Sequence, residues 1–177
     1  MDRDQLRAFG AAFDYDVSYM EALADASPDA FRKFGALFEA ANHREVAPID
    51  AMFAAKIVGA VAEDCGPCTQ LVVKMAAQSG MAADQIEAVL KRDVAAMNAD
   101  TALGFRFADA VVSRTADEDE ARDAVRAKWG DKGVIDLTFG AQLGRLYPMV
   151  KAGLGFAKEC RRVTVGDKPV TVVHRAA

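Results

Sequence analysis

Apolar residues recur at three- and four-residue intervals along most of this chain, and this spacing is the feature that most limits its fold. After Ser27 and Pro28, which form an N-cap and first-turn signal, one stripe holds Phe31, Phe34, Leu37, Phe38 and Ala41. A helix is therefore predicted over about 28–42. The same spacing predicts helices from Pro48 to about Asp64, from the turn at Cys65 to Gly80, over about 83–92 and 100–114, and from 131 to about 156.

Two local signals refine this pattern. Thr115 followed by Glu118 is typical of a capping box and predicts a helix that ends near Gly130. Pro148 is expected to kink or divide the last helix. The fold class is therefore all-α, with one domain over 1–158.

The end of the chain has a different pattern. Valines at 163, 165, 170 and 172 alternate around Gly166 and Asp167, which predicts a short hairpin or an extended arm over 159–177.

Charge and hydropathy exclude several classes of protein. The formal charge of −4 gives no general case for nucleic-acid binding, which usually shows as a basic face. The N-terminal residues do not read as a secretory signal, and no apolar run approaches the length of a membrane span. We expect a cytoplasmic protein with no nucleic-acid or membrane partner.

Two of the three cysteines stand in the sequence Cys-Gly-Pro-Cys at residues 65–68. The motif falls in a turn that leads directly into a helix. Free backbone N–H groups and the helix dipole stabilise a thiolate at such a position. The spacing also brings both sulfurs to one side of the turn, so that they can cycle between dithiol and disulfide. This argument favours Cys65 as the attacking sulfur and Cys68 as the resolving one.

Two other interpretations of the pair stay open. In a structural zinc site, the further ligands would have to come from His43, Cys160 and His174, none of which has zinc-finger spacing. Alternatively, both cysteines pack as small apolar side chains. That interpretation suits Cys68, which lies on the apolar stripe, but leaves the interruption at Cys65 unexplained.

Cys-Gly-Pro-Cys is also the active-site sequence of thioredoxins, which place it after a β-strand. Here the stretch "PIDAMFAAKIVGAVAED" predicts a long helix before the motif, so a thioredoxin fold does not fit. A helix, a Cys-x-x-Cys turn, a helix ending in Gly80 and then "MAADQIEAVLKRD" resemble the alkylhydroperoxidase D-like branch of the carboxymuconolactone decarboxylase superfamily. The order of elements fits from about residue 28 to 158.

This resemblance implies an all-helical bundle, assembled as a trimer or hexamer, whose thiol pair reduces peroxides or passes electrons to a partner. It implies no bound cofactor and no metal. The redox branch usually also carries a histidine one turn after the second cysteine and a glutamate in the preceding helix. Those positions hold Val72 and Phe53 here, so the usual proton relay is absent.

Glu63 is the carboxylate nearest in sequence to Cys65 and is the candidate replacement as general base. Lys56 is a weaker candidate, since an ammonium near the pair would favour a thiolate. The sequence thus predicts a thiol-dependent oxidoreductase with Cys65, Cys68 and Glu63 as site residues. Its substrates would be a peroxide or disulfide and a dithiol or protein reductant. The alternative is a non-catalytic helical binding protein whose cysteine pair is structural or regulatory.

Overall fold

The computed structural model describes residues 2–157 and 162–175, and within these ranges the chain is all-α, as predicted. Eight α-helices, one turn of 3-10 helix and a two-stranded hairpin make up the described part. They are α1 (Arg3–Phe13), α2 (Ser18–Ala26), α3 (Pro28–Ala41), α4 (Ile49–Ala62), α5 (Gly66–Gln78), α6 (Ala83–Lys91), η1 (Val94–Ala96), α7 (Ala99–Ser113), α8 (Glu118–Gly153), β1 (Thr164–Val165) and β2 (Lys168–Pro169).

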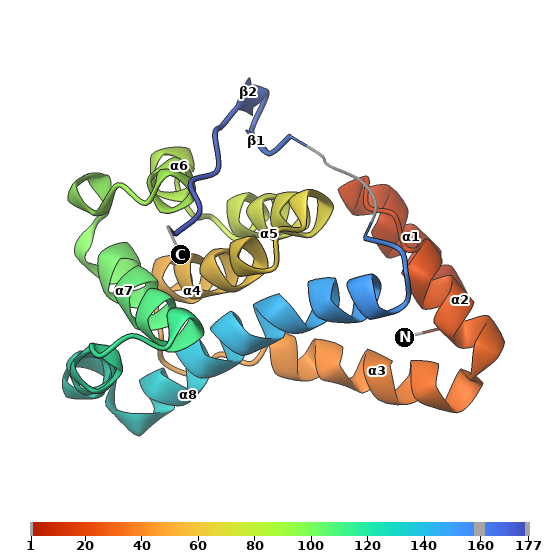
Figure 1. Cartoon of the computed structure of the whole chain (residues 1–177), viewed down its shortest axis with the longest axis horizontal. Coiled ribbons are helices and arrows are strands. Elements are labelled where there is room, and N and C mark those ends of the chain that lie inside the picture. Colours follow the sequence, from red (N-terminus) through yellow and green to blue (C-terminus); the bar gives the residue numbers. More distant parts are fainter. Residues whose placement is uncertain (1, 158–161, 176–177) are drawn as a thin grey trace.

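Helix α4 lies at the centre of the main core, between α7 and α8 (Figure 1). Every residue from Ala51 to Ala60 is buried, and all but Lys56 are apolar or glycine, as expected for a helix surrounded by others. Small residues let its neighbours approach closely. A Cβ on Gly144 of α8 would lie 2.6 Å from the carbonyl oxygen of Lys56, so only glycine fits at that crossing.

Helix α8 runs along the molecule from α7 to α3 and carries two features of the sequence (Figure 1). Gly130 has φ of +68° and breaks the helical geometry, which confirms the predicted break there. The division expected at Pro148 is wrong, because Gly130 alone in α8 has non-helical dihedral angles and the helix continues to Gly153. The alternative, a kink at Pro148 within a continuous helix, stays a prediction. Pro148 is buried.

The predicted capping box of Thr115 and Glu118 is also wrong. Helix α8 begins at Glu118 with Asp117 at the N-cap, and no side chain caps it. The Thr115 hydroxyl is buried and has no hydrogen-bond partner among the described residues. Its backbone instead joins the two helices, because its N–H donates to the carbonyl of Ala110 in α7 and its carbonyl accepts the N–H of Glu118 at 3.3 Å.

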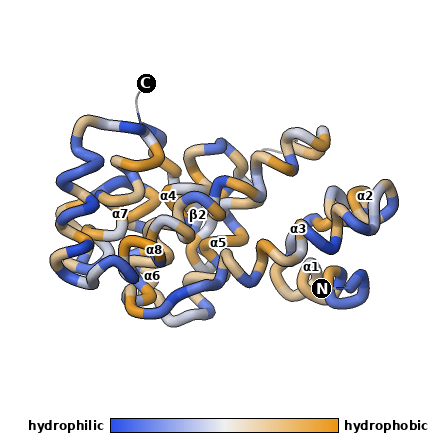
Figure 2. The backbone as a smooth tube through the Cα atoms, turned by 90° about the horizontal axis from the view of Figure 1, so that it is seen from below, coloured by the Kyte–Doolittle hydropathy of each residue, from blue (hydrophilic) through white to orange (hydrophobic). Residues whose placement is uncertain are grey.

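A second core joins α1, α2 and α3 to the C-terminal part of α8 and to the start of α5. Its buried members are Leu6, Tyr15, Tyr19, Met20, Ala24, Phe31, Cys65 and Cys68. Both views place α1–α3 together at one end of the molecule, away from α6 and α7 (Figures 1 and 2). Helices α1 and α2 were not among the predicted elements, although Asp2 and Gln5 form a capping box at the start of α1.

The end of the chain returns to α5 as an arm. Strands β1 and β2 pair antiparallel around Gly166, which has φ of +57°, so the predicted hairpin is confirmed. Gln70 of α5 holds the arm through two bonds to the backbone of Thr164, donating to its carbonyl at 3.1 Å and accepting its N–H at 2.6 Å. Within the described ranges, no helix combines the length and apolarity that crossing a membrane requires.

Candidate redox site

Cys65 and Cys68 form a disulfide at the N-terminus of α5, with their Cα atoms 5.3 Å apart. Cys65 is the N-cap residue, and its carbonyl accepts the first helical bond from Thr69 at 2.9 Å. Pro67 occupies the first turn, where the missing N–H costs no hydrogen bond. The pair therefore sits where the sequence predicted, close to the free N–H groups and the positive end of the helix dipole.

The disulfide is covered by the second core. Cys65 is 7 % exposed and Cys68 3 % exposed. Residues of α1–α3 and of the C-terminal part of α8 belong to this core, and a polar contact comes from Tyr15, whose hydroxyl oxygen lies 3.5 Å from Cys68 Sγ. Because a disulfide sulfur carries no proton, the hydroxyl is the donor. Sequence reasoning missed Tyr15, which is 53 positions away from Cys68 and belongs to no motif with it.

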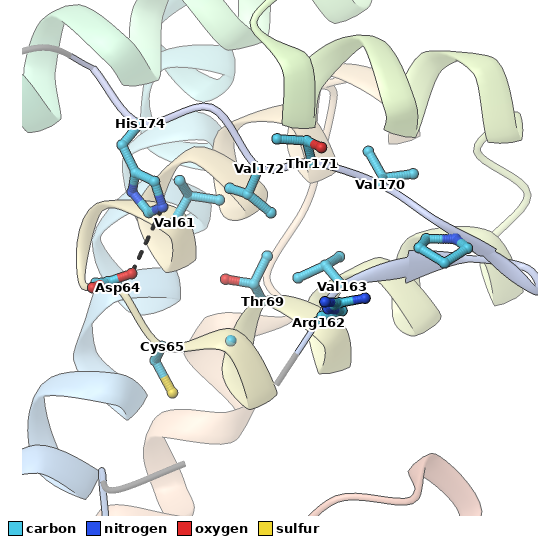
Figure 3. Close-up of a pocket in the computed structure, with 12 residues that line it drawn as sticks. Val61, Asp64, Cys65, Thr69, Arg162, Val163, Val170, Thr171, Val172 and His174 are labelled. Atoms are coloured by element: carbon cyan, nitrogen blue, oxygen red, sulfur yellow. Dashed lines mark ion pairs between the residues drawn. The ribbon is translucent and has the colours of Figure 1, made fainter. Parts of the chain in front are cut away.

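On the Cys65 side, a pocket of about 460 Å³ opens between the start of α5 and the C-terminal arm (Figure 3). Val163, Val170 and Val172 supply apolar side chains from the arm. The polar groups are Thr69, Thr171, Arg162 and the ion pair of Asp64 with His174, at 3.6 Å. Cys65 lies at the edge of this pocket, and its sulfur points away from the arm (Figure 3).

On the Cys68 side lies a smaller, mostly apolar cavity of about 60 Å³. All three tyrosines of the chain line it, namely Tyr15, Tyr19 and Tyr147. Burial raises the pKa of Tyr15 and of Tyr147 to about 12, and it raises the pKa of Tyr19 further. These hydroxyls therefore stay protonated over the pH range in which thiols titrate. The two sulfurs of one disulfide thus border two different environments.

Lys56, the weaker candidate, lines the same cavity as Cys68. It is buried, and its ammonium donates to the carbonyl of Ala41 at 2.6 Å. Burial lowers the pKa of Lys56 to about 8, because the charged form is poorly solvated there.

Glu63 is half-buried in the turn between α4 and α5, and Arg145 of α8 binds its carboxylate. The guanidinium Nε lies 2.6 Å from Glu63 Oε1. No sequence motif links Glu63 to this partner, which comes from a helix 82 positions later. Glu63 is thus next to the cysteine pair in the chain, with its charge balanced by a cation.

The two relay positions are buried and apolar. Phe53 of α4 and Val72 of α5 are each 8 % exposed and belong to the main core. Neither can transfer a proton. Among the described residues, Tyr15 is the polar side chain that contacts a sulfur of the pair, that of Cys68.

The candidates for a zinc site do not gather around the pair. His174 faces Asp64, whereas His43 lies 3.7 Å from both Glu45 and Asp136 at the other end of α4. Cys160 lies outside the described residues. Over 2–157 and 162–175, no group of three or more histidine, cysteine, aspartate or glutamate side chains is placed to hold a metal ion.

Comparison with protein-family models, with curated proteins and with solved structures finds no match to this chain. The class of protein is therefore defined by the fold and the site themselves. This is an all-helical domain that carries a Cys-x-x-Cys disulfide at a helix N-terminus, an arrangement consistent with thiol redox chemistry.

Proposed function

We propose that this protein is a thiol-dependent oxidoreductase whose Cys65 and Cys68 cycle between dithiol and disulfide. The observation that carries the proposal is the bonded pair at the start of α5, with Cys65 at the edge of an open pocket. The resemblance of the helix order and the Cys-x-x-Cys turn to the alkylhydroperoxidase D-like branch supports it further.

In the proposed cycle, Cys65 is the sulfur that reacts with external thiols and disulfides, and Cys68 is the resolving sulfur. The pocket of about 460 Å³ beside Cys65 supports this assignment, since ligand pockets of this size hold small molecules or a peptide segment. The cover over Cys68 restricts direct access to the other sulfur.

Glu63 is the proposed general base for the attacking thiol. Its place two residues before Cys65 supports this role. The carboxylate is paired with Arg145, so accepting a proton requires that ion pair to open during the cycle.

Disulfide exchange with a dithiol or protein partner is the preferred reaction. The apolar side chains of Phe53 and Val72 stand where the related redox enzymes carry their proton relay, which argues against fast peroxide turnover. Slow peroxide reduction by the same pair is the second reaction that we propose to test, with a dithiol as electron donor.

The protein is also proposed to form a homo-oligomer. Large apolar side chains are exposed along α8 and beside it, namely Val46, Ile135, Phe139, Met149 and Leu154. Ile135 and Phe139 are four residues apart and share one face of the helix. Light scattering on the wild type and on Phe139→Glu tests this, and a monomeric wild type would contradict it.

A non-catalytic helical binding protein with a structural disulfide is the alternative function. The low exposure of both cysteine residues, 7 % for Cys65 and 3 % for Cys68, is the observation in its favour. In that case the bond would stabilise the junction of α4 and α5 without turning over.

One set of variants separates the two functions. Rates of reduction by dithiothreitol, of exchange with oxidised glutathione and of peroxide consumption are measured in the wild type, Cys65→Ser and Cys68→Ser, each also carrying Cys160→Ser. Among the cysteine variants, we expect turnover only in the protein that keeps both Cys65 and Cys68, and a trapped mixed disulfide at Cys65 in Cys68→Ser. A separate variant, Glu63→Gln, should turn over several-fold more slowly. Equal rates in all variants would leave only the binding role.

A further inference from the structure

We propose that Tyr15 is the hydrogen-bond donor that stabilises the Cys68 thiolate whenever the disulfide opens, a role that rests on the redox function proposed above. The hydroxyl oxygen lies 3.5 Å from Cys68 Sγ, and both side chains are buried, at 6 % and 3 % exposure. A charged acceptor strengthens such a bond, so the contact favours the reduced, ionised state of Cys68 over its neutral thiol.

The rest of the fold holds Tyr15 against the sulfur. Its ring packs edge-on against Phe9 and Tyr19, with centroids 6.5 Å apart in each case. Its backbone N–H bonds to Gly10 at 2.9 Å, which fixes the turn after α1. From α5 itself, the ammonium of Lys74 donates to the carbonyl of Phe13 at 2.6 Å and ties this turn to the helix that carries Cys68.

The hydroxyl acts as a donor and keeps its proton. Burial raises the pKa of Tyr15 to about 12, well above the range in which thiols ionise. Tyr15 thus lowers the energy of the thiolate without transferring a proton to it, which differs from the role of a histidine relay.

Reduction of the disulfide leaves a negative charge on Cys68 Sγ, the atom that the Tyr15 hydroxyl contacts. A thiolate of the dithiol reductant attacks Cys65 Sγ, the bond between the two protein sulfurs breaks, and its electron pair leaves on Cys68 as a thiolate. The second thiolate of the reductant then attacks the reductant sulfur that is bonded to Cys65 Sγ, and Cys65 leaves as a thiolate. The reductant becomes a cyclic disulfide, and its two protons end on the two protein thiols.

Other ionisable groups surround Cys68, and the test must separate them from Tyr15. Tyr19, Tyr147 and Lys56 line the same cavity, from α2, α8 and α4 respectively. Lys151 of α8 has its ammonium 5.3 Å from the centre of the Tyr15 ring and 3.8 Å from Asp16.

The experiment measures the pKa of Cys68 by the ultraviolet absorbance of its thiolate. A background of Cys65→Ser and Cys160→Ser leaves Cys68 as the only cysteine of the three. In this background, Tyr15→Phe is expected to raise the proton affinity of Cys68 about tenfold, the usual worth of a hydrogen bond to a charged group. Tyr147→Phe is the matched control, because its buried hydroxyl lines the same cavity without a hydrogen-bond partner among the described residues.

An unchanged Cys68 pKa in Tyr15→Phe would overturn the proposal, as would an equal change in Tyr147→Phe. If Tyr15→Phe does not fold, a fluorinated tyrosine at position 15 replaces it, in a Tyr19→Phe and Tyr147→Phe background that leaves no other tyrosine. The more acidic hydroxyl should then lower the Cys68 pKa, and no change would again overturn the role of Tyr15.

The result is independent of the proposed function. A wild type that fails to exchange with dithiothreitol or oxidised glutathione refutes the oxidoreductase, whereas the titration still reports whether Tyr15 stabilises the thiolate. Conversely, a protein that turns over normally with an unshifted Cys68 keeps its function and loses this assignment.

Discussion

The fully buried carboxylate of Asp136 accepts the backbone N–H of Ala47, with Oδ2 2.9 Å from the nitrogen. The same carboxylate accepts the N–H groups of Val46 at 2.9 Å and Glu45 at 3.0 Å. These bonds fasten the loop before α4 to α8. They therefore fix where α4 begins, and α4 leads directly to the cysteine pair.

Replacing Asp136 should destabilise the fold. In Asp136→Asn only one oxygen is left to accept three N–H groups, so we expect a loss of about 1–3 kcal/mol in the free energy of unfolding. Urea unfolding measures it, with Asp119→Asn on the exposed face of α8 as the control. A loss no greater than in the control would contradict this role of Asp136.

Asp136 should also make stability depend on pH. Burial alone would favour the neutral acid, but the N–H groups of Ala47, Val46 and Glu45 outweigh it and hold the pKa of Asp136 below its ordinary value. The charged form thus adds stability that is present above the unfolded pKa of about 4 and is lost as the pH falls through the folded value. Asp136→Asn should show a shallower loss of unfolding free energy in acid than the wild type.

Gly144 should not tolerate a methyl group. An alanine Cβ there would lie 2.6 Å from the Lys56 carbonyl oxygen, so α8 and α4 would have to separate. Gly144→Ala is expected to cost about 1–3 kcal/mol of unfolding free energy. Gly35→Ala in α3, where nothing lies near the added Cβ, should instead be neutral or stabilising. Thermal unfolding of the pair distinguishes close packing from a general glycine effect.

Titration of Lys56 should make the free energy of unfolding rise with pH in mild alkali. Its pKa is about 8 in the folded state and near 10.4 in the unfolded chain, so between these values the unfolded state binds more protons. Unfolding free energy should therefore rise with pH from about 8 to 9.5. Above that range, the raised pKa values of the tyrosines begin to act in the opposite direction.

Denaturant unfolding of the oxidised protein at several pH values measures this slope. Lys56→Met should remove most of it, because the ammonium whose pKa burial lowers to about 8 is then absent. A wild type and a Lys56→Met variant with parallel pH profiles would show that Lys56 is not the cause.

The arm should control how fast Cys65 reacts. Gln70→Ala removes both bonds to Thr164, so the arm should loosen from α5 and alkylation of Cys65 in the reduced protein should become several-fold faster. Gln85→Ala is the matched control, since Gln85 is also buried and also holds backbone groups, those of Ala96 and Asn98, but belongs to α6. Equal alkylation rates in the two variants would mean that the arm does not govern access to Cys65.

Elements with strong local signals were predicted well. Ser27 caps α3 by accepting the N–H of Ala30, and the apolar stripe after it predicted a helix within one residue of the observed end. Gly66 and Pro67 interrupt two apolar stretches, and α5 begins at Gly66, with three residues between it and the end of α4 at Ala62. These signals act between residues a few positions apart, which is why a sequence displays them.

Two local signals of α8 were misleading. Thr115 and Glu118 have the spacing of a capping box, but α8 begins at Glu118 itself, with Asp117 at the N-cap. Pro148 lacks a helical donor, yet the helix continues past it to Gly153. A local preference alone therefore decided neither how α8 is capped nor where it ends.

The sequence alone determined the closeness of Cys65 and Cys68, because three residues at the start of a helix bring two side chains to one side of a turn whatever surrounds them. It also determined the helical class, through the period of its apolar residues. Only the tertiary structure decided that Tyr15 contacts Cys68, that Arg145 binds Glu63 and that an arm borders Cys65. Those contacts join segments far apart in the chain. Which of these segments meet is determined by how the helices pack and what they bury, and no short-range sequence pattern encodes it.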